Sequence, residues 1–161
     1  MKTAEIVLNP IGVIRSPNTD PSKTPIQPSY AEGLKGYAEI YPEYAEGLKY
    51  LEGFSHIFLI YYFHKASSEK LKVIPYLDSV ERGVFATRAP SRPNKIGISL
   101  VELVKIEGNV LHLNKVDILD GTPLLDIKPY ISRFDKVENS RNGWQDEIDE
   151  EKANSLGSRK K

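Results

Sequence analysis

The sequence predicts a mostly β domain, built as a small closed or nearly closed β-barrel with one or two short helices. Six or seven short segments rich in β-branched and aromatic residues alternate with turn-forming residues along the 161-residue chain. Only one segment has convincing helical spacing of its apolar residues, and closing the sheet would remove its unpaired edges. We expect one barrel domain over residues 1–135. Residues 136–161 are polar, and we expect a C-terminal tail whose last residues, Arg159 to Lys161, fray.

The first half of the chain contributes three predicted strands. Residues 5–14, rich in Ile, Leu and Val, form the first. Residues 16–29, rich in Pro, Ser and Thr, form a long loop of a kind that is often functional, and residues 36–41 form a short strand. Tyr and Leu at helical spacing predict a short helix over residues 43–51. Residues 54–64 are almost continuously apolar and aromatic, which predicts a strand buried on both faces.

The second half of the chain contributes the remaining strands. Residues 83–88 are predicted to form a strand, and residues 98–106 and 110–119 a hairpin across a Gly-Asn turn. Residues 124–131 form a last strand, which an internal proline weakens. The apolar pattern then fades, and a short helix is predicted within the tail over residues 144–156.

The composition narrows the class of protein. Hydrophobic residues make up 40% and charged residues 27% of the chain, no apolar run approaches the ~20 residues that cross a bilayer, and we expect no signal peptide. The chain has no cysteine, which excludes disulfides, zinc-thiolate sites and cysteine nucleophiles and makes a reducing cytoplasm the expected compartment. The formal net charge is zero, so any RNA contact must come from a local basic patch or from another subunit.

Several familiar site motifs do not occur in the sequence. Neither Gly-x-Gly-x-x-Gly nor Gly-x-x-x-x-Gly-Lys-Ser/Thr is present, so a conventional dinucleotide-type site is not expected. His56, His64 and His112 lack His-Glu-x-x-His spacing, and we expect no metal site. We interpret His56 as a hydrogen-bonded core histidine. His64 ends its predicted strand, where a core role and a site role fit equally well.

One segment of the sequence concentrates positive charge. Arg82, Arg88, Arg92 and Lys95 lie close together, against the single acid Glu81. Prolines between them restrict the backbone, and guanidinium groups held in this way suit carboxylate or phosphate ligands. A rigid, solvated surface turn would have the same composition. The residues alone leave both interpretations open.

A second motif, Asp120-Gly-Thr-Pro123, follows a predicted strand and, taken alone, is best explained as a plain β-turn. A functional interpretation of this motif becomes favoured over a plain turn because it belongs to a series of four motifs that occur in order. These are Ile11–Pro17, Leu51–His56, Gly83–Asn94 followed by Ile96-Gly97, and Leu119–Tyr130. The series resembles the TsaA-like family, known for the tRNA methyltransferase TrmO, over roughly residues 5–132.

The resemblance implies a small β-barrel that binds S-adenosylmethionine without a Rossmann sheet, in a homodimer with the cofactor near the subunit interface. It implies methylation of N6 of threonylcarbamoyladenosine at tRNA position 37, in an anticodon loop whose bases are accessible. Matched motif by motif, the implied cofactor contacts are Gln27, Pro28, Ser29, His64, Lys65, Arg88, Ile98, Ile118, Leu119, Asp120 and Gly121.

Methyl transfer mainly requires alignment of the reactants, and this suggests roles for individual residues. We expect Arg88 to pair with the methionine carboxylate or to anchor its loop. Asp120 is the candidate catalytic residue: it either accepts the N6 proton or orients its loop, and we favour orientation. Arg92, Asn94 and Lys95 are expected to face the tRNA. Family members usually have proline where this chain has Lys95, and the lysine frees a backbone N–H and adds a positive charge.

Two other functions stay open. A regulatory or accessory module would bind S-adenosylmethionine in the same pocket without methylating tRNA. Zero net charge favours it, as does a short polar tail in place of the second domain of well-studied bacterial members. A plain RNA-binding barrel would need aromatic side chains on an open sheet face. Tyr61, Tyr62 and Phe63 are candidates, but their continuous apolar setting favours a core position.

Overall fold

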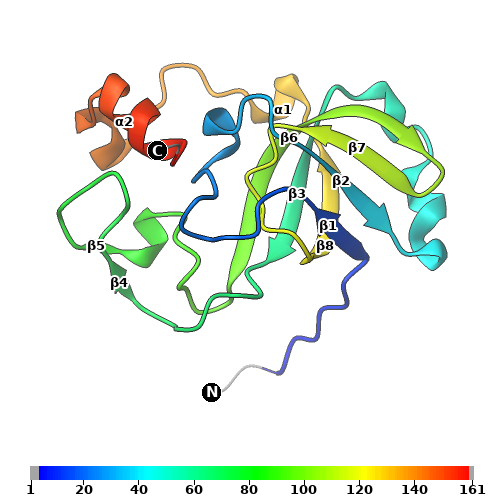
Figure 1. The fold of residues 1–161 in the computed structure, drawn as a ribbon, viewed down its shortest axis with the longest axis horizontal. Coiled ribbons are helices and arrows are strands. Elements are labelled where there is room, and N and C mark those ends of the chain that lie inside the picture. The colour runs from blue at the N-terminus through cyan, green and yellow to red at the C-terminus, as the bar shows by residue number, and fades with distance from the viewer. Residues whose placement is uncertain (1–3, 160–161) are drawn as a thin grey trace.

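The computed structural model describes residues 4–159, and its centre is a closed barrel of six antiparallel strands (Figure 1). The order around the barrel is β1-β2-β7-β6-β3-β8, and β8 pairs with β1 to close it. The strands are β1 (Gly12–Arg15), β2 (Lys35–Ile40), β3 (His56–Tyr62), β6 (Ile96–Glu107), β7 (Val110–Asn114) and β8 (Thr122–Pro129). The predicted fold class is confirmed, as is the hairpin of β6 and β7. Beside the barrel, β4 (Lys72–Val73) pairs with β5 (Arg82–Gly83).

Side chains alternate between the barrel interior and its outer surface. In β3, Leu59 is buried whereas its neighbour Phe58 is only partly buried. The expectation that this strand is buried on both faces is wrong, because the outer face of a barrel wall meets solvent. For the same reason His56 is half-buried, outside the core, with Nδ1 2.8 Å from Ser55 Oγ. The interior is filled by Ile14, Ala38, Ile40, Ile57, Leu59, Val101, Leu111, Leu113, Val116 and Leu124.

The helices are short, and most are 3₁₀ turns. They are η1 (Pro28–Tyr30), η2 (Pro42–Leu48), η3 (Leu51–Gly53), η4 (Val84–Ala86), α1 (Ser132–Asp135), η5 (Gly143–Glu147) and α2 (Glu150–Gly157). The helix expected over residues 43–51 is divided into η2 and η3, because Tyr50 has a left-handed φ of 68° that interrupts it. The expected tail helix is likewise divided into η5 and α2. No helix within residues 4–159 is long and apolar enough to cross a membrane.

Three predicted strands are clearly shorter than expected, and one of them is β7, which ends at Asn114 rather than at residue 119. The first strand begins at Gly12 rather than at residue 5, because its partner β2 ends at Ile40, opposite Gly12, and Pro10 lacks an N–H for a ladder. The preceding residues extend away from the barrel (Figure 1). The strand expected over residues 83–88 is wrong beyond Gly83. Val84 is buried, and its carbonyl accepts from Thr87 N–H at 3.1 Å, which closes the turn η4.

The C-terminal tail packs beside the two-stranded sheet and the early loop (Figure 1). Ile26 N–H donates to the Gly157 carbonyl at 3.0 Å. The guanidinium of Arg159 lies 4.4 Å from the ring centroid of Tyr76. Fraying is therefore the wrong expectation for Arg159, while residues 160–161 lie outside the described residues.

Candidate functional site

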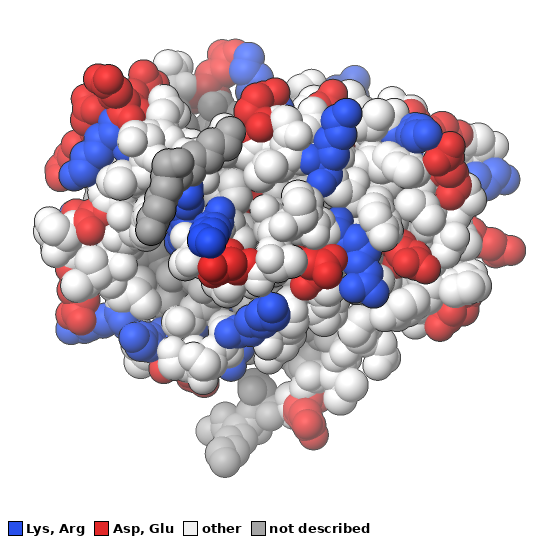
Figure 2. Space-filling model, viewed as in Figure 1, with Lys and Arg blue, Asp and Glu red and all other residues white. Residues whose placement is uncertain are grey.

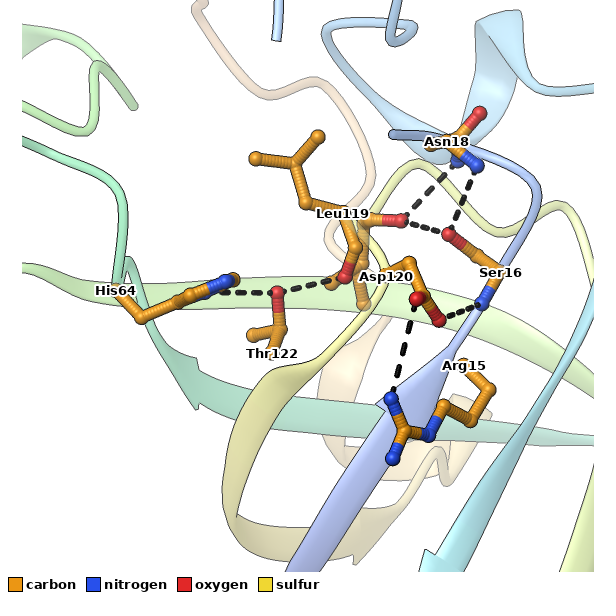
Figure 3. A network of polar contacts seen from close by, with 8 residues as sticks. Arg15, Ser16, Asn18, His64, Leu119, Asp120 and Thr122 are labelled. Atoms are coloured by element: carbon orange, nitrogen blue, oxygen red, sulfur yellow. Dashed lines mark hydrogen bonds and ion pairs between the residues drawn. The ribbon is translucent and has the colours of Figure 1, made fainter. Parts of the chain in front are cut away.

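The Asp120–Pro123 motif spans the end of the loop between β7 and β8 and the start of β8, and hydrogen bonds connect it to the segment around the end of β1 (Figure 3). Gly121 N–H donates to the Ile14 carbonyl, and Asp120 N–H donates to the Asn18 carbonyl, each at 2.8 Å. Gly121 has a φ of +77°, a left-handed conformation that glycine adopts without strain. The loop is therefore held in one path.

The Asp120 carboxylate has a partner at each oxygen (Figure 3). Oδ1 accepts from Ser16 N–H at 3.2 Å, and Oδ2 lies 3.8 Å from Arg15 Nη1. The ion pair is half-exposed and long, so it adds little to stability. Both contacts join the loop to the end of β1, which favours the orienting role of Asp120 over that of a proton acceptor.

His64 reaches the same loop from the end of β3 (Figure 3). Its Nδ1 lies 3.3 Å from Thr122 Oγ1, and that hydroxyl donates to the Leu119 carbonyl at 2.7 Å. Because a hydroxyl has one proton, the imidazole Nδ1–H must be the donor to Thr122. Partial burial and the charge of Lys65 lower the pKa of His64, although Asp120 opposes them. The ring is therefore neutral near neutral pH, with a lone pair on Nε2.

Arg88 comes from the arginine-rich segment and meets the early loop. Its Nη1 donates to Gln27 Oε1 at 2.7 Å, which joins two of the predicted cofactor residues. Burial raises the pKa of Asp117 and of Tyr61, and the positive charge of Arg88 opposes the rise at both groups. Arg88 thus lies near the barrel wall that leads into the Asp120 loop. Its side chain is exposed, so donors of the guanidinium are available to a carboxylate.

The other basic residues of this segment hold their own loop. Arg92 Nη1 donates to the carbonyls of Thr87 at 3.0 Å and Ala89 at 3.3 Å. Lys95 Nζ donates to the Ala66 carbonyl at 2.9 Å, beside the end of β3. Both side chains are partly exposed, so their contact with tRNA stays a prediction alongside this structural role.

A chain of buried hydrogen bonds that sequence reasoning missed lies behind the site. Ser99 Oγ donates to Asp117 Oδ1 at 2.7 Å and lies 3.0 Å from Tyr61 Oη. Burial raises the pKa of Asp117 to about 7, although the bond from Ser99 opposes the rise. Ser99 and Asp117 are sequence neighbours of Ile98 and Ile118, so the chain aligns two predicted cofactor segments from within the barrel. The only signal of this hydrogen-bond chain in the sequence is Asp117, an acid between the apolar residues Val116 and Ile118.

Most of the predicted cofactor residues therefore belong to loops that meet at one end of the barrel. The backbone N–H groups of Ile118 and Leu119 have no hydrogen-bond partner within residues 4–159. Ile118 is buried and Leu119 is partly exposed. Ile98 is 45% exposed on the outer face of β6, and its expected contact with the cofactor through its backbone stays a prediction. Ser29, Lys65 and Asn94 are exposed. The described part of the chain contains no cluster of His, Asp or Glu side chains suited to a metal ion.

The comparison with protein families matches this chain to the tRNA-methyltransferase O N-terminal domain over residues 13–136. A crystal structure of TrmO superposes with a TM-score of 0.76 at 44% identity, and the match covers 87% of this chain and 64% of that one. A probable S-adenosyl-L-methionine-binding protein of Pyrococcus abyssi is 56% identical over 139 residues, 86% of this chain and 76% of the relative. Human tRNA (adenine(37)-N6)-methyltransferase is 39% identical over 86% of this chain but only 33% of its own length.

Proposed function

This chain belongs to the TrmO N-terminal domain family, and we propose that it is an S-adenosylmethionine-dependent methyltransferase acting on N6 of threonylcarbamoyladenosine at tRNA position 37. The observation that carries the proposal is the bond between Arg88 and Gln27, set near the anchored Asp120 loop. It joins segments that are far apart in the sequence and that the family resemblance assigns to one cofactor.

The chemistry of the site suits S-adenosylmethionine. The exposed guanidinium of Arg88 matches a carboxylate. The unpartnered N–H groups of Ile118 and Leu119 offer directional donors to a nucleobase. The relative from Pyrococcus abyssi has S-adenosylmethionine binding in its name, which also supports this ligand.

Transfer of the methyl group needs alignment more than acid catalysis, since the cofactor supplies a carbon that carries its own good leaving group. Arg88 and the Ile118–Gly121 loop hold the donor, and Asp120 keeps that loop in place through Ser16 and Arg15. N6 loses its proton as the new bond forms. The Nε2 lone pair of neutral His64, whose ring contacts the same loop through Thr122, would accept that proton.

The proposal is tested by incubating the full chain with methyl-labelled S-adenosylmethionine and tRNA that carries the threonylcarbamoyl group. Label should appear on the modified base at position 37 and be absent from tRNA that lacks the modification. Tight cofactor binding with no label in the tRNA would contradict the methyltransferase assignment.

Replacement of Arg88 by alanine should weaken S-adenosylmethionine binding by one to two orders of magnitude, since it removes a charge-assisted bond worth about 1.5–3 kcal/mol. Calorimetric titration measures the effect. Lys105→Ala, which removes a surface cation outside the site, is the control and should bind like the wild type. Equal affinities for Arg88→Ala and wild type would remove Arg88 from the cofactor site.

A cofactor-binding accessory module is the second candidate, because the Pyrococcus abyssi relative is named for S-adenosylmethionine binding alone. Such a module would bind the cofactor with the same dependence on Arg88 and transfer no methyl group. For either function we propose a homodimer in the cytoplasm. Exposed Phe85 (77%), Ile96 (39%) and Ile98 (45%) offer apolar surface close to the cofactor segments for the partner subunit.

A further inference from the structure

We propose that the outer barrel face formed by β1, β2 and β7 is a second contact for single-stranded RNA, in which a base stacks on Tyr37 while Lys35 and Arg15 neutralise phosphates. The choice of RNA as the ligand rests on the proposed function. The hollow on this face is bordered by Asp120 and is lined by neither Arg88 nor Gln27.

Three side chains form a row across neighbouring strands of this face. In the sheet register, Arg15 on β1 is opposite Tyr37 on β2, and Tyr37 is opposite His112 on β7. Directly opposite residues on one face have Cβ atoms about 4.5–5.5 Å apart. The adjacent Ile14 and Ala38 are buried in the core, so the row points outward. Tyr37 therefore lies between Arg15 and His112 in this row.

The row lines an open hollow of about 590 Å³ that extends to Asp120. This volume is within the range of about 300–1,000 Å³ that is usual for ligand sites. Tyr37 is 41% exposed and has no ring contact or side-chain hydrogen bond within the described part of the chain. An exposed aromatic face between polar side chains is the arrangement on which an unpaired base stacks.

The two ends of the hollow differ in charge. Lys35 lines one end and forms no ion pair within residues 4–159. Two acids lie toward the other end, where Glu107 Oε2 is 2.8 Å from His112 Nε2 and Glu39 follows Tyr37 on the same face of β2. The third acid, Asp120, also lines the hollow, and its charge is opposed by Arg15 Nη1 at 3.8 Å, whereas Lys35 has no such partner among the described residues. A phosphate backbone is therefore favoured at the Lys35 end.

The contact has to be local, because charges of both signs are interspersed over the face in Figure 2. This agrees with a chain whose formal net charge is zero. The ion pair between Arg15 and Asp120 is long, at 3.8 Å, so the guanidinium keeps donors for a phosphate. An RNA strand whose base stacks on Tyr37 would next contact Arg15 and then the Asp120 loop. The hollow therefore connects the proposed RNA contact to the proposed reaction site.

The test measures binding of an unmodified RNA hairpin with the sequence of a tRNA anticodon arm, by fluorescence anisotropy over a series of salt concentrations. Tyr37→Ala should weaken RNA binding by roughly tenfold or more, the effect of losing one stacked base. Lys35→Gln should reduce the slope of log Kd against log salt concentration by about 0.7, the value for one single-strand phosphate. Both variants should bind S-adenosylmethionine like the wild type, since neither residue belongs to the cofactor site.

Tyr44→Ala is the matched control, because Tyr44 is 40% exposed on η2 and lies outside the hollow. It should leave RNA binding unchanged. A thiouridine-labelled hairpin should also crosslink to the peptide that contains Tyr37. Wild-type affinity in Tyr37→Ala, or a wild-type protein that binds no RNA, would overturn the inference. Failure of the chain to bind S-adenosylmethionine, with the RNA contact at Tyr37 intact, would overturn the proposed function alone.

Discussion

At the scale of single residues, Asp117 connects the barrel interior to the site. When its carboxyl group is ionised, it accepts the hydrogen bond that the Ser99 hydroxyl donates. Because that hydroxyl has one proton, Tyr61 must then donate to Ser99. The bonds cross from the β7–β8 connection to β6 and β3, each of which leads into a predicted cofactor segment. Burial raises the pKa of Asp117 to about 7, so its charge state changes within the physiological range.

The raised pKa of Asp117 makes stability depend on pH in a predictable direction. The folded protein holds this proton up to about pH 7, whereas the unfolded chain releases it near the ordinary aspartate pKa of 3.8. The stability from this group is fully present below about pH 4 and is lost as pH rises through about 7. Asp117→Asn removes this titrating group. The free energy of unfolding of the variant, relative to that of the wild type, should therefore rise by a few kcal/mol between about pH 5 and about pH 8.

Denaturant unfolding at both pH values measures the change for Asp117→Asn. Asp126→Asn is the control, since that carboxyl group is half-exposed and pairs with Lys128 at 3.1 Å. Its stability difference from the wild type should stay nearly constant. A difference for Asp117→Asn that does not grow with pH would mean that Asp117 is ionised throughout this range.

At the scale of elements, Lys95 sets the geometry of the loop that presents the arginines. Its φ is 48°, and its N–H donates to the Arg92 carbonyl at 3.2 Å. Its own carbonyl accepts from Phe63 N–H at 2.8 Å, which attaches the loop to the end of β3. A proline, which is usual here in the family, has a fixed negative φ and no N–H. The loop of this chain therefore follows a path that a proline does not permit.

Lys95→Pro should destabilise the protein by at least about 1 kcal/mol, because the native φ is outside the range of proline and a hydrogen bond is lost. Lys95→Gly removes the same charge but permits the left-handed conformation, so its stability should stay close to that of the wild type. Thermal unfolding of the pair separates backbone geometry from charge. Equal midpoints for both variants would contradict a backbone role.

The elements also separate what the sequence predicts from what it does not. A continuous apolar and aromatic run identifies β3, and the Gly-Asn turn identifies the hairpin of β6 and β7, whereas the exposure of the outer face of β3 depends on closure of the barrel. The segment after Gly83 has the composition of a strand, but burial of Val84 and the bond from Thr87 turn it into η4. The same holds for the site. Motifs identify Arg88 and Asp120, whereas the pairing of Ser99 with Asp117 depends on the sheet register and has no local signature.

At the scale of the whole molecule, the tail completes the support of the site. The family match ends at residue 136, yet residues beyond it contact both loops that meet at Arg88 and Gln27. Trp144 Nε1 donates to the Ala86 carbonyl at 2.8 Å, two residues before Arg88. Ile26 N–H donates to the Gly157 carbonyl, one residue before Gln27. The tail therefore links the two segments that the bond between Arg88 and Gln27 also joins.

Displacing the tail should weaken cofactor binding while leaving the barrel folded. A Cβ at Gly157 would lie 2.6 Å from the Tyr30 ring, so Gly157→Ala should push the tail away, whereas a Cβ at Gly47 meets nothing within 4 Å. We expect Gly157→Ala to lose hydrogen-exchange protection at the Ile26 amide and to shift the fluorescence of Trp144, the only tryptophan in the chain. S-adenosylmethionine affinity should fall several-fold, because the Arg88–Gln27 pair loses preorganisation. Gly47→Ala should change none of these. A detached tail with unchanged cofactor affinity would show that the two loops hold their positions without it.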